Sequence, residues 1–382
     1  MAWSIFKSII LCFMKILKLS LSVFCLFLFS LAQAQTDLSL FKSMEPRSIG
    51  PAGMSGRVTA IDVVRHNRNV IYIGTASGGV WKSTSAGTEW EPIFDDQEVA
   101  SIGALAIDPS NPSVIWVGTG EGNPRNSLNS GYGLYRSLDA GRTWQHMGLE
   151  KTRNIHRVIV HPNDPKTVWV GAIGSPWGEH EERGVFKTTD GGKTWKKVLY
   201  GGPGVGTADL VLDPSNPNKL IAAMWEHRRY PWFFNSGGPA SGIYISHDGG
   251  ETWDRKTSED GLPKGDLGRI GLAIAPSMPD RVYAYVESKE NAIYRSDNGG
   301  VDWYRISNRG DRGIGNRPFY YAEIYVDPKN ENRVYSIHTY VTSSEDGGKS
   351  FNTFVNPGYV HVDNHAYYIH PDDPNFIVLG ND

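Results

Sequence analysis

An eight-residue turn motif recurs six times along this chain, and no other feature constrains the fold as strongly. The copies follow the pattern Ser/Thr-x-Asp-x-Gly-x-x-aromatic, and their final aromatic residues lie roughly fifty residues apart. Repeats of this length, separated by short β-branched runs, are typical of the four-stranded blades of a β-propeller and not of a helical solenoid. The copies are Ser83–Trp90, Ser137–Trp144, Thr188–Trp195, Ser246–Trp253, Ser296–Trp303 and Ser344–Phe351.

Each conserved position of this motif, the Asp-box, has a structural role in a tight turn. The aspartate accepts hydrogen bonds from backbone N–H groups of its own turn, the glycine permits positive φ, and the aromatic side chain packs between neighbouring sheets. Ser85 stands at the aspartate position of the first copy, which a turn tolerates more readily than a catalytic site would. We therefore interpret the following residues as structural: Asp139, Asp190, Asp248, Asn298 and Asp346.

A second repeated phrase, of the type Asp-Pro-x-Asn, precedes each Asp-box and predicts another tight turn. One blade then has the order strand, Asp-Pro turn, strand, variable loop, strand, Asp-box turn, strand. The chain holds seven such openings but six Asp-boxes, so we predict an all-β propeller of six blades plus the start of a seventh, the front part of a longer protein. The expected blades span approximately residues 50–95, 96–148, 149–199, 200–258, 262–307, 312–356 and, in part, 357–382.

The first 34 residues have the layout of a secretory signal peptide. They contain lysines but no acidic residue, an apolar run, and the small-x-small sequence Ala32-Gln33-Ala34. We expect the mature protein to be exported to the periplasm, the cell surface or the medium, with no membrane contact after cleavage. Residues 35–49 form a lead segment, in which Leu38–Met44 is a candidate to add a strand to the last blade.

Composition excludes several classes of partner and stabilising group. Both cysteines, Cys12 and Cys25, lie in the leader, so no disulfide framework supports the mature fold. The formal net charge is -3, and positive residues are interspersed with acidic ones, which argues against a nucleic-acid partner. We predict neither a metal nor another cofactor, and the oligomeric state stays open.

The loops between second and third strands vary most in length and content, so the end of the propeller that bears them is the expected functional face. The long loops belong to blades two, three and four. They place aromatic rings next to Arg and Glu, which suits a sugar ring, a peptide side chain or a chain terminus. Alternatively, the tryptophans anchor the loops to the scaffold. The candidate ligand-binding residues here are Arg125, Trp177, Trp225, Arg228, Arg229 and Trp232.

The starts of the innermost strands predict a polar funnel on the propeller axis, or a merely solvated channel. Within the sequence His361-Val362-Asp363-Asn364-His365, strand spacing would point both histidines and Asp363 to one side, as a metal or an acid–base pair requires. A hydrogen-bonded channel wall is the alternative. The charged or imidazole side chains at this level are Arg57, His156, Arg157, Asp209, Arg269, Glu323 and His365, to which His361 is added as a candidate ligand.

The Asp-box, the Asp-Pro turn and second strands such as Val117-Gly118-Thr119 together resemble the BNR-repeat proteins of the sortilin (Vps10) type. The resemblance extends to bacterial exported proteins labelled glycosyl hydrolase, and it implies either a bound peptide or glycan, or glycan cleavage. Two departures stand against the enzymes. Xyloglucan-active relatives carry a catalytic aspartate where this chain has Ala76, and the sialidase arginine segment is replaced by Arg47-Ser48-Ile49.

Three hypotheses follow from the sequence. The first is an exported module that binds a peptide or glycan on the long loops of blades two to four. The second is a glycoside hydrolase with a non-standard carboxylate pair, and the third is a purely architectural repeat. The carboxylates available for hydrolysis are Glu121, Glu179, Glu182, Glu226 and Asp363.

Overall fold

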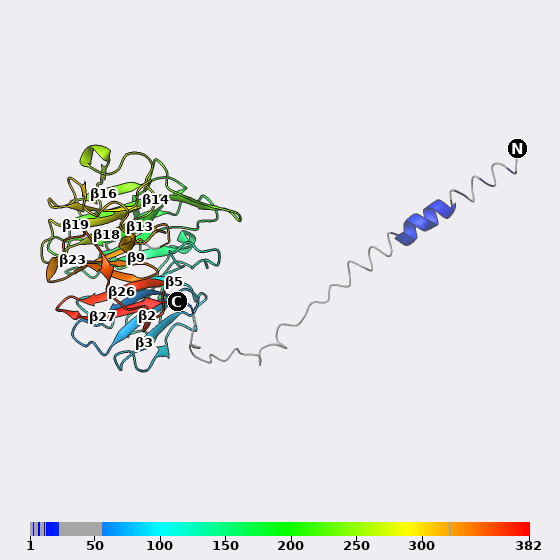
Figure 1. The fold of residues 1–382 in the computed structure, drawn as a ribbon. Coiled ribbons are helices and arrows are strands. Elements are labelled where there is room, and N and C mark those ends of the chain that lie inside the picture. The colour runs from blue at the N-terminus through cyan, green and yellow to red at the C-terminus, as the bar shows by residue number, and fades with distance from the viewer. Residues whose placement is uncertain (1–2, 4–6, 8–10, 12, 23–55, 321) are drawn as a thin grey trace. The chain divides into compact units, whose positions relative to one another are not determined.

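The computed structural model describes residues 3, 7, 11, 13–22, 56–320 and 322–382 of the chain (Figure 1). The chain divides into two units, Met1–Gly50 and Pro51–Asp382. In the first unit, residues 13–22 are helical. No helix within the described residues is both long and apolar enough to cross a membrane. The predicted cleavage site at Ala32-Gln33-Ala34 and the candidate strand Leu38–Met44 lie outside the described residues.

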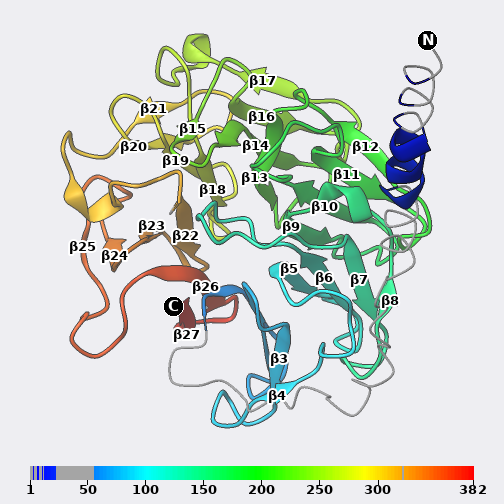
Figure 2. The same ribbon diagram turned by 90° about the vertical axis from the view of Figure 1, so that its right-hand side faces the viewer.

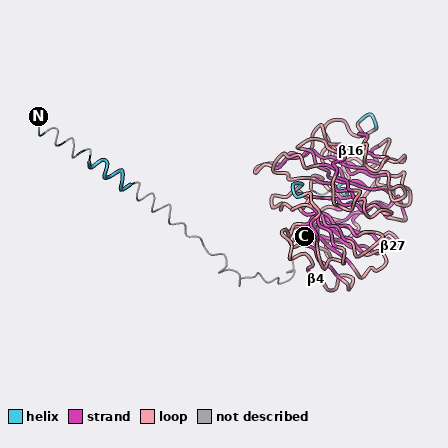
Figure 3. The backbone as a smooth tube through the Cα atoms, turned by 180° about the vertical axis from the view of Figure 1, so that it is seen from behind, coloured by secondary structure: helices cyan, strands magenta, loops and turns pink. Residues whose placement is uncertain are grey.

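The second unit is built from antiparallel sheets of four consecutive strands, which confirms the predicted β-propeller (Figure 3). Within the residues that the structure describes, six sheets contain the four expected strands, and a seventh contains two. In the fourth blade a short extra strand pairs with the end of the second strand, β14 (Leu220–Arg229). The first three blades comprise β1 (Val58–Val63), β2 (Ile71–Thr75), β3 (Val80–Ser83) and β4 (Glu91–Pro92); β5 (Ile102–Ile107), β6 (Ile115–Thr119), β7 (Leu134–Ser137) and β8 (Gln145–His146); and β9 (Ile155–Val160), β10 (Val168–Ala172), β11 (Gly184–Thr188) and β12 (Lys196–Leu199).

Among the described residues, three short 3-10 helices lie in the connections between blades, η2 (Glu150–Thr152), η3 (Ser258–Asp260) and η4 (Arg312–Ile314). The remaining strands of the propeller follow the same order along the chain. They are β13 (Val205–Leu212), β14 (Leu220–Arg229), β15 (Phe234–Ser236), β16 (Gly242–Ser246) and β17 (Asp254–Lys256); β18 (Ile270–Ile274), β19 (Val282–Val286), β20 (Ala292–Ser296) and β21 (Tyr304–Arg305); β22 (Glu323–Asp327), β23 (Asn330–Ile337), β24 (Val341–Ser344) and β25 (Asn352–Thr353); and β26 (Asn364–His370) with β27 (Asp373–Asn381).

The first strand of every sheet faces the axis, and these strands contact one another in a closed ring that runs from β1 through β5, β9, β13, β18 and β22 to β26 (Figure 2). The ring closes because β26 and β27 pack against β1. Two ion pairs join the seventh sheet to the first, Arg65 with Asp372 at 2.7 Å and Arg68 with Asp373 at 2.7 Å. Seven sheets therefore surround one axis.

Apolar side chains fill the spaces between neighbouring sheets. Trp116 of the second blade, for example, is 1% exposed and lies in one cluster with Phe186 and Val170 of the third. The motif aromatics extend this packing, because the Trp144 indole donates to the Ile93 carbonyl of the preceding blade at 2.6 Å. Adjacent blades thus share one apolar core, as expected for a radial repeat.

The repeat turns have the hydrogen bonds that the motif predicts. Asp190 accepts from the backbone N–H of Thr194 at 3.0 Å and from its hydroxyl at 2.6 Å. The Thr194 hydroxyl bond is the main reason that the pKa of Asp190 lies below its usual range. In the first turn Ser85 replaces the aspartate, and its hydroxyl accepts from the Glu89 N–H at 2.8 Å. A hydroxyl fulfils the turn role, which explains why the acidic residue is dispensable there.

Candidate functional site

The axis of the propeller holds a buried network of charged side chains from several blades. Arg157 on β9 donates to Asp209 on β13 at 2.7 Å and to Glu323 on β22 at 2.6 Å. Arg269, 1% exposed, donates to Glu323 at 3.2 Å and to His156 at 2.9 Å. Inner strands from four blades are therefore tied together across the axis by paired charges.

Burial and pairing set the protonation states in this axial network. Burial, followed by the charge of Arg157, lowers the pKa of His156 to about 3, so the imidazole is neutral and its Nε2 accepts from the guanidiniums. Burial alone would raise the pKa of Glu323, but Arg157 holds it below the usual range. Each carboxylate already has guanidinium or backbone partners. The pairing of these carboxylates favours a structural role for them.

A second cluster lies between the first strand of blade one and the long loop of blade two. Arg57 donates to both carboxylate oxygens of Glu121, at 2.6 and 2.8 Å, and the Glu121 side chain is fully buried. Glu121 is one of the carboxylates that the sequence offers for hydrolysis. Because one arginine engages both of its carboxylate oxygens, it is a poor candidate for proton transfer.

His365 joins the same region of the axis from the seventh sheet. Its Nε2 lies 2.9 Å from the carboxylate of Asp382, and its Nδ1 lies 3.4 Å from the amide of Asn123 in the blade-two loop. Arg125 lies over the Tyr320 ring at 4.8 Å. The predicted candidates Arg57, Arg125, His156, Arg157, Arg269 and His365 thus contribute to the axial end of the loop face.

The expectation that His361, Asp363 and His365 share one strand face is wrong. β26 begins at Asn364, so His361 and Asp363 precede the strand. Asp363 also adopts a φ of 62°, which breaks the alternation of an extended chain. His361 is exposed, whereas His365 is buried. Within the parts of the chain that the structure describes, no group of three or more His, Cys, Asp or Glu could hold a metal ion.

In the blade-three loop, Trp177 is 41% exposed and the buried Arg183 organises the backbone around it. Arg183 donates to the carbonyl oxygens of Gly178 at 2.7 Å and Gly204 at 3.1 Å. Glu179 is exposed, and Glu182 lies 4.0 Å from the His180 ring. The loop therefore presents one aromatic side chain and three accessible carboxylates, those of Glu179, Glu181 and Glu182, from a fixed backbone.

In blade four the predicted long loop is largely a hairpin, because β14 continues through Arg229 and pairs with β15. Trp225 lies inside this continued strand, fully buried, with its ring stacked on His227 at 4.2 Å. A ligand cannot reach that ring, so Trp225 does not serve as the exposed aromatic contact that the sequence suggested. Glu226 follows it and accepts from the Ala240 N–H at 3.2 Å.

The tip of the β14–β15 hairpin carries a preformed group of aromatic rings, Tyr230, Trp232 and Phe233, which we call the aromatic tip. Tyr230 and Phe233 are stacked at 4.5 Å, and Trp232 is 78% exposed. Arg228 lies over the Tyr230 ring at 5.3 Å. The hairpin projects from the body of the propeller (Figure 1).

Arg229 fixes the base of this hairpin to the two neighbouring long loops. Its side chain donates to the carbonyl of Pro124 in blade two, and its backbone N–H donates to the carbonyl of Pro176 in blade three at 2.7 Å. The loops of blades two, three and four consequently form one continuous surface. The sequence predicted that these three loops lie together, and the structure brings them together through Arg229.

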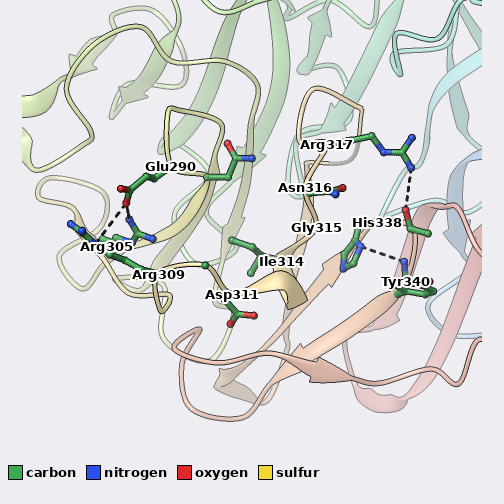
Figure 4. Close-up of a pocket in the computed structure, with 13 residues that line it drawn as sticks. Glu290, Arg305, Arg309, Asp311, Ile314, Gly315, Asn316, Arg317, His338 and Tyr340 are labelled. Atoms are coloured by element: carbon green, nitrogen blue, oxygen red, sulfur yellow. Dashed lines mark hydrogen bonds and ion pairs between the residues drawn. The ribbon is translucent and has the colours of Figure 1, made fainter.

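A pocket of about 930 Å³ lies between blades five and six, where the sequence offered no candidate. It is formed by three segments, the β19–β20 loop, the connection that follows β21, and the β23–β24 loop (Figure 4). The three segments carry no sequence motif, and the pocket exists only because the fold brings them together. The side chains that dominate it are Glu290, Asn291, Arg305, Arg309, Asp311, Asn316, Arg317, His338 and Tyr340.

Sequence reasoning also missed Glu287, which directly follows β19. Burial raises its pKa, and it accepts from the Ser236 hydroxyl at 2.6 Å and from the Arg269 N–H at 2.8 Å. Ser236 lies on β15, in the segment that leads to Ala240, the residue that donates to Glu226. Glu287 lies at the end of a second strand, next to a variable loop, and this position is the sequence signal that could have identified it.

A ring of small antiparallel sheets around one axis defines the protein as a β-propeller. The family model described as sortilin, neurotensin receptor 3 (Sortilin-Vps10) matches residues 132–261. The resemblance to the sortilin-type repeat proteins, and to exported proteins labelled glycosyl hydrolase, is confirmed by this match together with the relatives that follow.

Curated relatives of the chain are xyloglucanases. A xyloglucanase from Paenibacillus sp is 28% identical over 243 residues, which is 57% of this chain and 22% of the relative. The xyloglucanase Xgh74A of Acetivibrio thermocellus is 24% identical over 344 residues, 78% of this chain and 38% of the relative. The chain therefore spans well under half the length of these two relatives.

Solved structures share the fold with this chain. The GH74 xyloglucanase from Xanthomonas campestris superposes with a TM-score of 0.60 at 18% identity, over 85% of this chain and 51% of that one. YCF48 bound to D1 peptide superposes with a TM-score of 0.57 at 14% identity, over 85% of this chain and 91% of that one. Identities this low establish the propeller architecture alone.

Proposed function

We propose that this propeller binds a polysaccharide across its loop face, as part of an exported protein of the glycoside-hydrolase type. The observation that carries the proposal is the aromatic tip, held by Arg229 to the loops of blades two and three beside the exposed ring of Trp177. Rigid rings at a polar surface suit the apolar faces of sugar rings, while nearby Arg and Glu suit their hydroxyls.

The curated relatives favour a glycan over a peptide as the ligand. The xyloglucanases named above act on a polysaccharide, and their similarity covers more than half of this chain. We take a β-linked glucan with neutral side branches as the first substrate class to test. The leader-like segment at residues 1–34 supports export. An exported protein would encounter such a polymer outside the cell.

Titration of the full-length protein with xyloglucan oligosaccharides, monitored by calorimetry and tryptophan fluorescence, tests this function. Trp232→Ala should weaken binding by about tenfold, since an aromatic contact contributes on the order of 1 kcal/mol or more. Tyr359→Ala is the matched control, because Tyr359 is 89% exposed but lies on the connection before the seventh sheet. Equal binding by both variants, or no glycan binding at all, contradicts the proposal.

Glycan hydrolysis is the second candidate function, favoured by the named activity of the relatives and by the carboxylates Glu226 and Glu287 near the β15 segment. A buried carboxyl with a raised pKa is suited to act as a general acid. Ala76 stands against the xyloglucanase-type pair, because alanine neither donates nor accepts a proton. Release of reducing sugar by the wild type, lost in Glu287→Gln, would establish hydrolysis.

A further inference from the structure

The pocket between blades five and six has an excess of positive charge. Arg305, Arg309 and Arg317 line it together with two carboxylates, Glu290 and Asp311. Arg305 donates to Glu290 at 2.7 Å, and Arg309 lies 3.7 Å from the same carboxylate. Asp311 accepts from the Gly313 N–H at 2.8 Å and so stabilises the turn in which it lies. Three guanidiniums therefore share the pocket with two carboxylates, and two of the three, Arg305 and Arg309, lie at the same carboxylate of Glu290.

The accessible cations lie on opposite sides of the pocket. Arg309 is 82% exposed on the side of Glu290, whereas Arg317 lies on the side of Thr339, to whose hydroxyl it donates at 3.4 Å (Figure 4). Asn291 and Asn316 also line the pocket and supply amides that can both donate and accept hydrogen bonds. Such a lining can hold a carboxylate at each end of a short chain of hydroxylated rings.

One wall of the pocket is rigid before any ligand arrives. The segment from Gly313 to Gly315 is held through its carbonyl oxygens by His338 at 3.1 Å, by Thr342, by Ser336 at 3.3 Å and by Tyr285 at 3.1 Å. Burial lowers the pKa of His338, so its ring is neutral and donates to the Gly313 carbonyl. Tyr340, 46% exposed and edge-on to His338, adds an aromatic surface. This preorganisation reduces the ordering cost of binding.

We propose that this pocket binds an acidic sugar, a uronate-containing oligosaccharide whose carboxylates pair with Arg309 and Arg317. The inference rests on the proposed function in taking the ligand to be a glycan, and it adds a charge selectivity that the aromatic tip does not provide. A volume of about 930 Å³ suits a short oligosaccharide. Asparagine, tyrosine and glutamate side chains would contact hydroxyls, while the guanidiniums would discriminate the carboxylate from a neutral sugar.

The test compares oligogalacturonate with neutral cello-oligosaccharide of the same length, in calorimetry on the full-length protein. The acidic oligomer should bind more tightly, and its affinity should fall as salt is raised, because exposed charges are screened. Arg309→Gln should reduce oligogalacturonate affinity about tenfold, the loss expected for one charge-assisted hydrogen bond. Arg142→Gln, in the exposed turn of blade two, should leave it unchanged. Thermal unfolding of each variant verifies that the fold persists.

The outcomes separate the two proposals. If neutral glycans bind through Trp232 while oligogalacturonate does not bind, or binds equally well in Arg309→Gln, the acidic-sugar inference fails and the proposed function stands. If no glycan binds, both fail. If a short peptide with a free carboxyl terminus displaces oligogalacturonate from the pocket, and its amidated form does not, the pocket takes peptide carboxylates and the inference is overturned.

Discussion

The Arg57 guanidinium donates to both carboxylate oxygens of Glu121, so the first strand of blade one is fastened to the long loop of blade two. The pair lies at the axial end of the loop face, and its carboxylate is fully buried. In the sequence Glu121 is a candidate glycosidase carboxylate, whereas in the structure it holds the blade-two loop to Arg57. The pair stabilises the position of this loop.

Removal of one partner of this pair should destabilise the fold. Arg57→Met leaves a buried, unpaired Glu121 charge and should lower the free energy of unfolding by about 3 kcal/mol. The double variant Arg57→Met/Glu121→Met should recover most of that loss, because no charge is then left unpaired. Urea unfolding of both variants measures the difference. Equal destabilisation by the single and double variants would show that Arg57 does not compensate the buried charge of Glu121.

The free energy of unfolding should fall with decreasing pH because of His156. In the folded protein the pKa of His156 is about 3, below its ordinary value of 6.5, so the unfolded chain binds the proton more readily. The stabilisation is complete above pH 6.5 and is lost as the pH falls toward 3. Between pH 6.5 and 5 this group alone should account for about 2 kcal/mol.

Urea unfolding at a series of pH values, for the wild type and His156→Asn, isolates this contribution. The variant should show a shallower decrease below pH 6.5, although His227 and His180, whose pKa values burial lowers to about 3 and about 4, still contribute in both proteins. Two parallel curves would show that His156 is protonated alike in the folded and unfolded chains.

The repeat turns should affect stability and leave binding unchanged. Ser344 is fully buried and accepts from the Gly348 N–H at 2.8 Å, so Ser344→Ala leaves a turn donor unsatisfied. We expect a loss of about 1 to 2 kcal/mol in unfolding free energy. Glycan affinity should be that of the wild type, because these turns and the variable loops lie at opposite ends of each blade. If Ser344→Ala unfolds with the same free energy as the wild type but binds glycan more weakly, the binding surface lies at the end of the propeller that bears the repeat turns.

The hairpin anchor should affect affinity through the position of the aromatic tip. Arg229→Met removes the side-chain bond to the Pro124 carbonyl but retains the apolar stem of the residue. We expect a several-fold weaker glycan affinity with little change in unfolding free energy, since the hairpin projects from the core. Arg228→Met, which removes a cation beside Tyr230 but no such anchor, is the comparison. An Arg229→Met variant with wild-type affinity would show that the tip needs no fixed base.

The sequence predicted the blades because each repeat fixes its own turns, and turn chemistry is local. Counting back from each Asp-Pro turn also located Arg157, Asp209 and Glu323, since each of them lies four residues before the first residue of its turn phrase. The pocket between blades five and six could not be predicted, because three unremarkable segments create it only when they meet.

Other differences from the sequence reasoning arise where the backbone departs from the repeat. Trp225 is buried because β14 runs through to Arg229, where a loop was expected. His361 leaves the strand because Asp363 takes a positive φ. Both departures depend on pairing with other segments of the chain. The periodicity of the sequence does not predict such pairing.

The decisive measurement is the binding of xyloglucan oligosaccharide to the full-length protein, with Trp232→Ala and Tyr359→Ala compared side by side. We expect binding by the wild type, an affinity about tenfold weaker in Trp232→Ala, and no change in Tyr359→Ala. Glycan binding that is insensitive to Trp232, or absent from the wild type, would contradict the assignment of the loop face as a polysaccharide-binding surface.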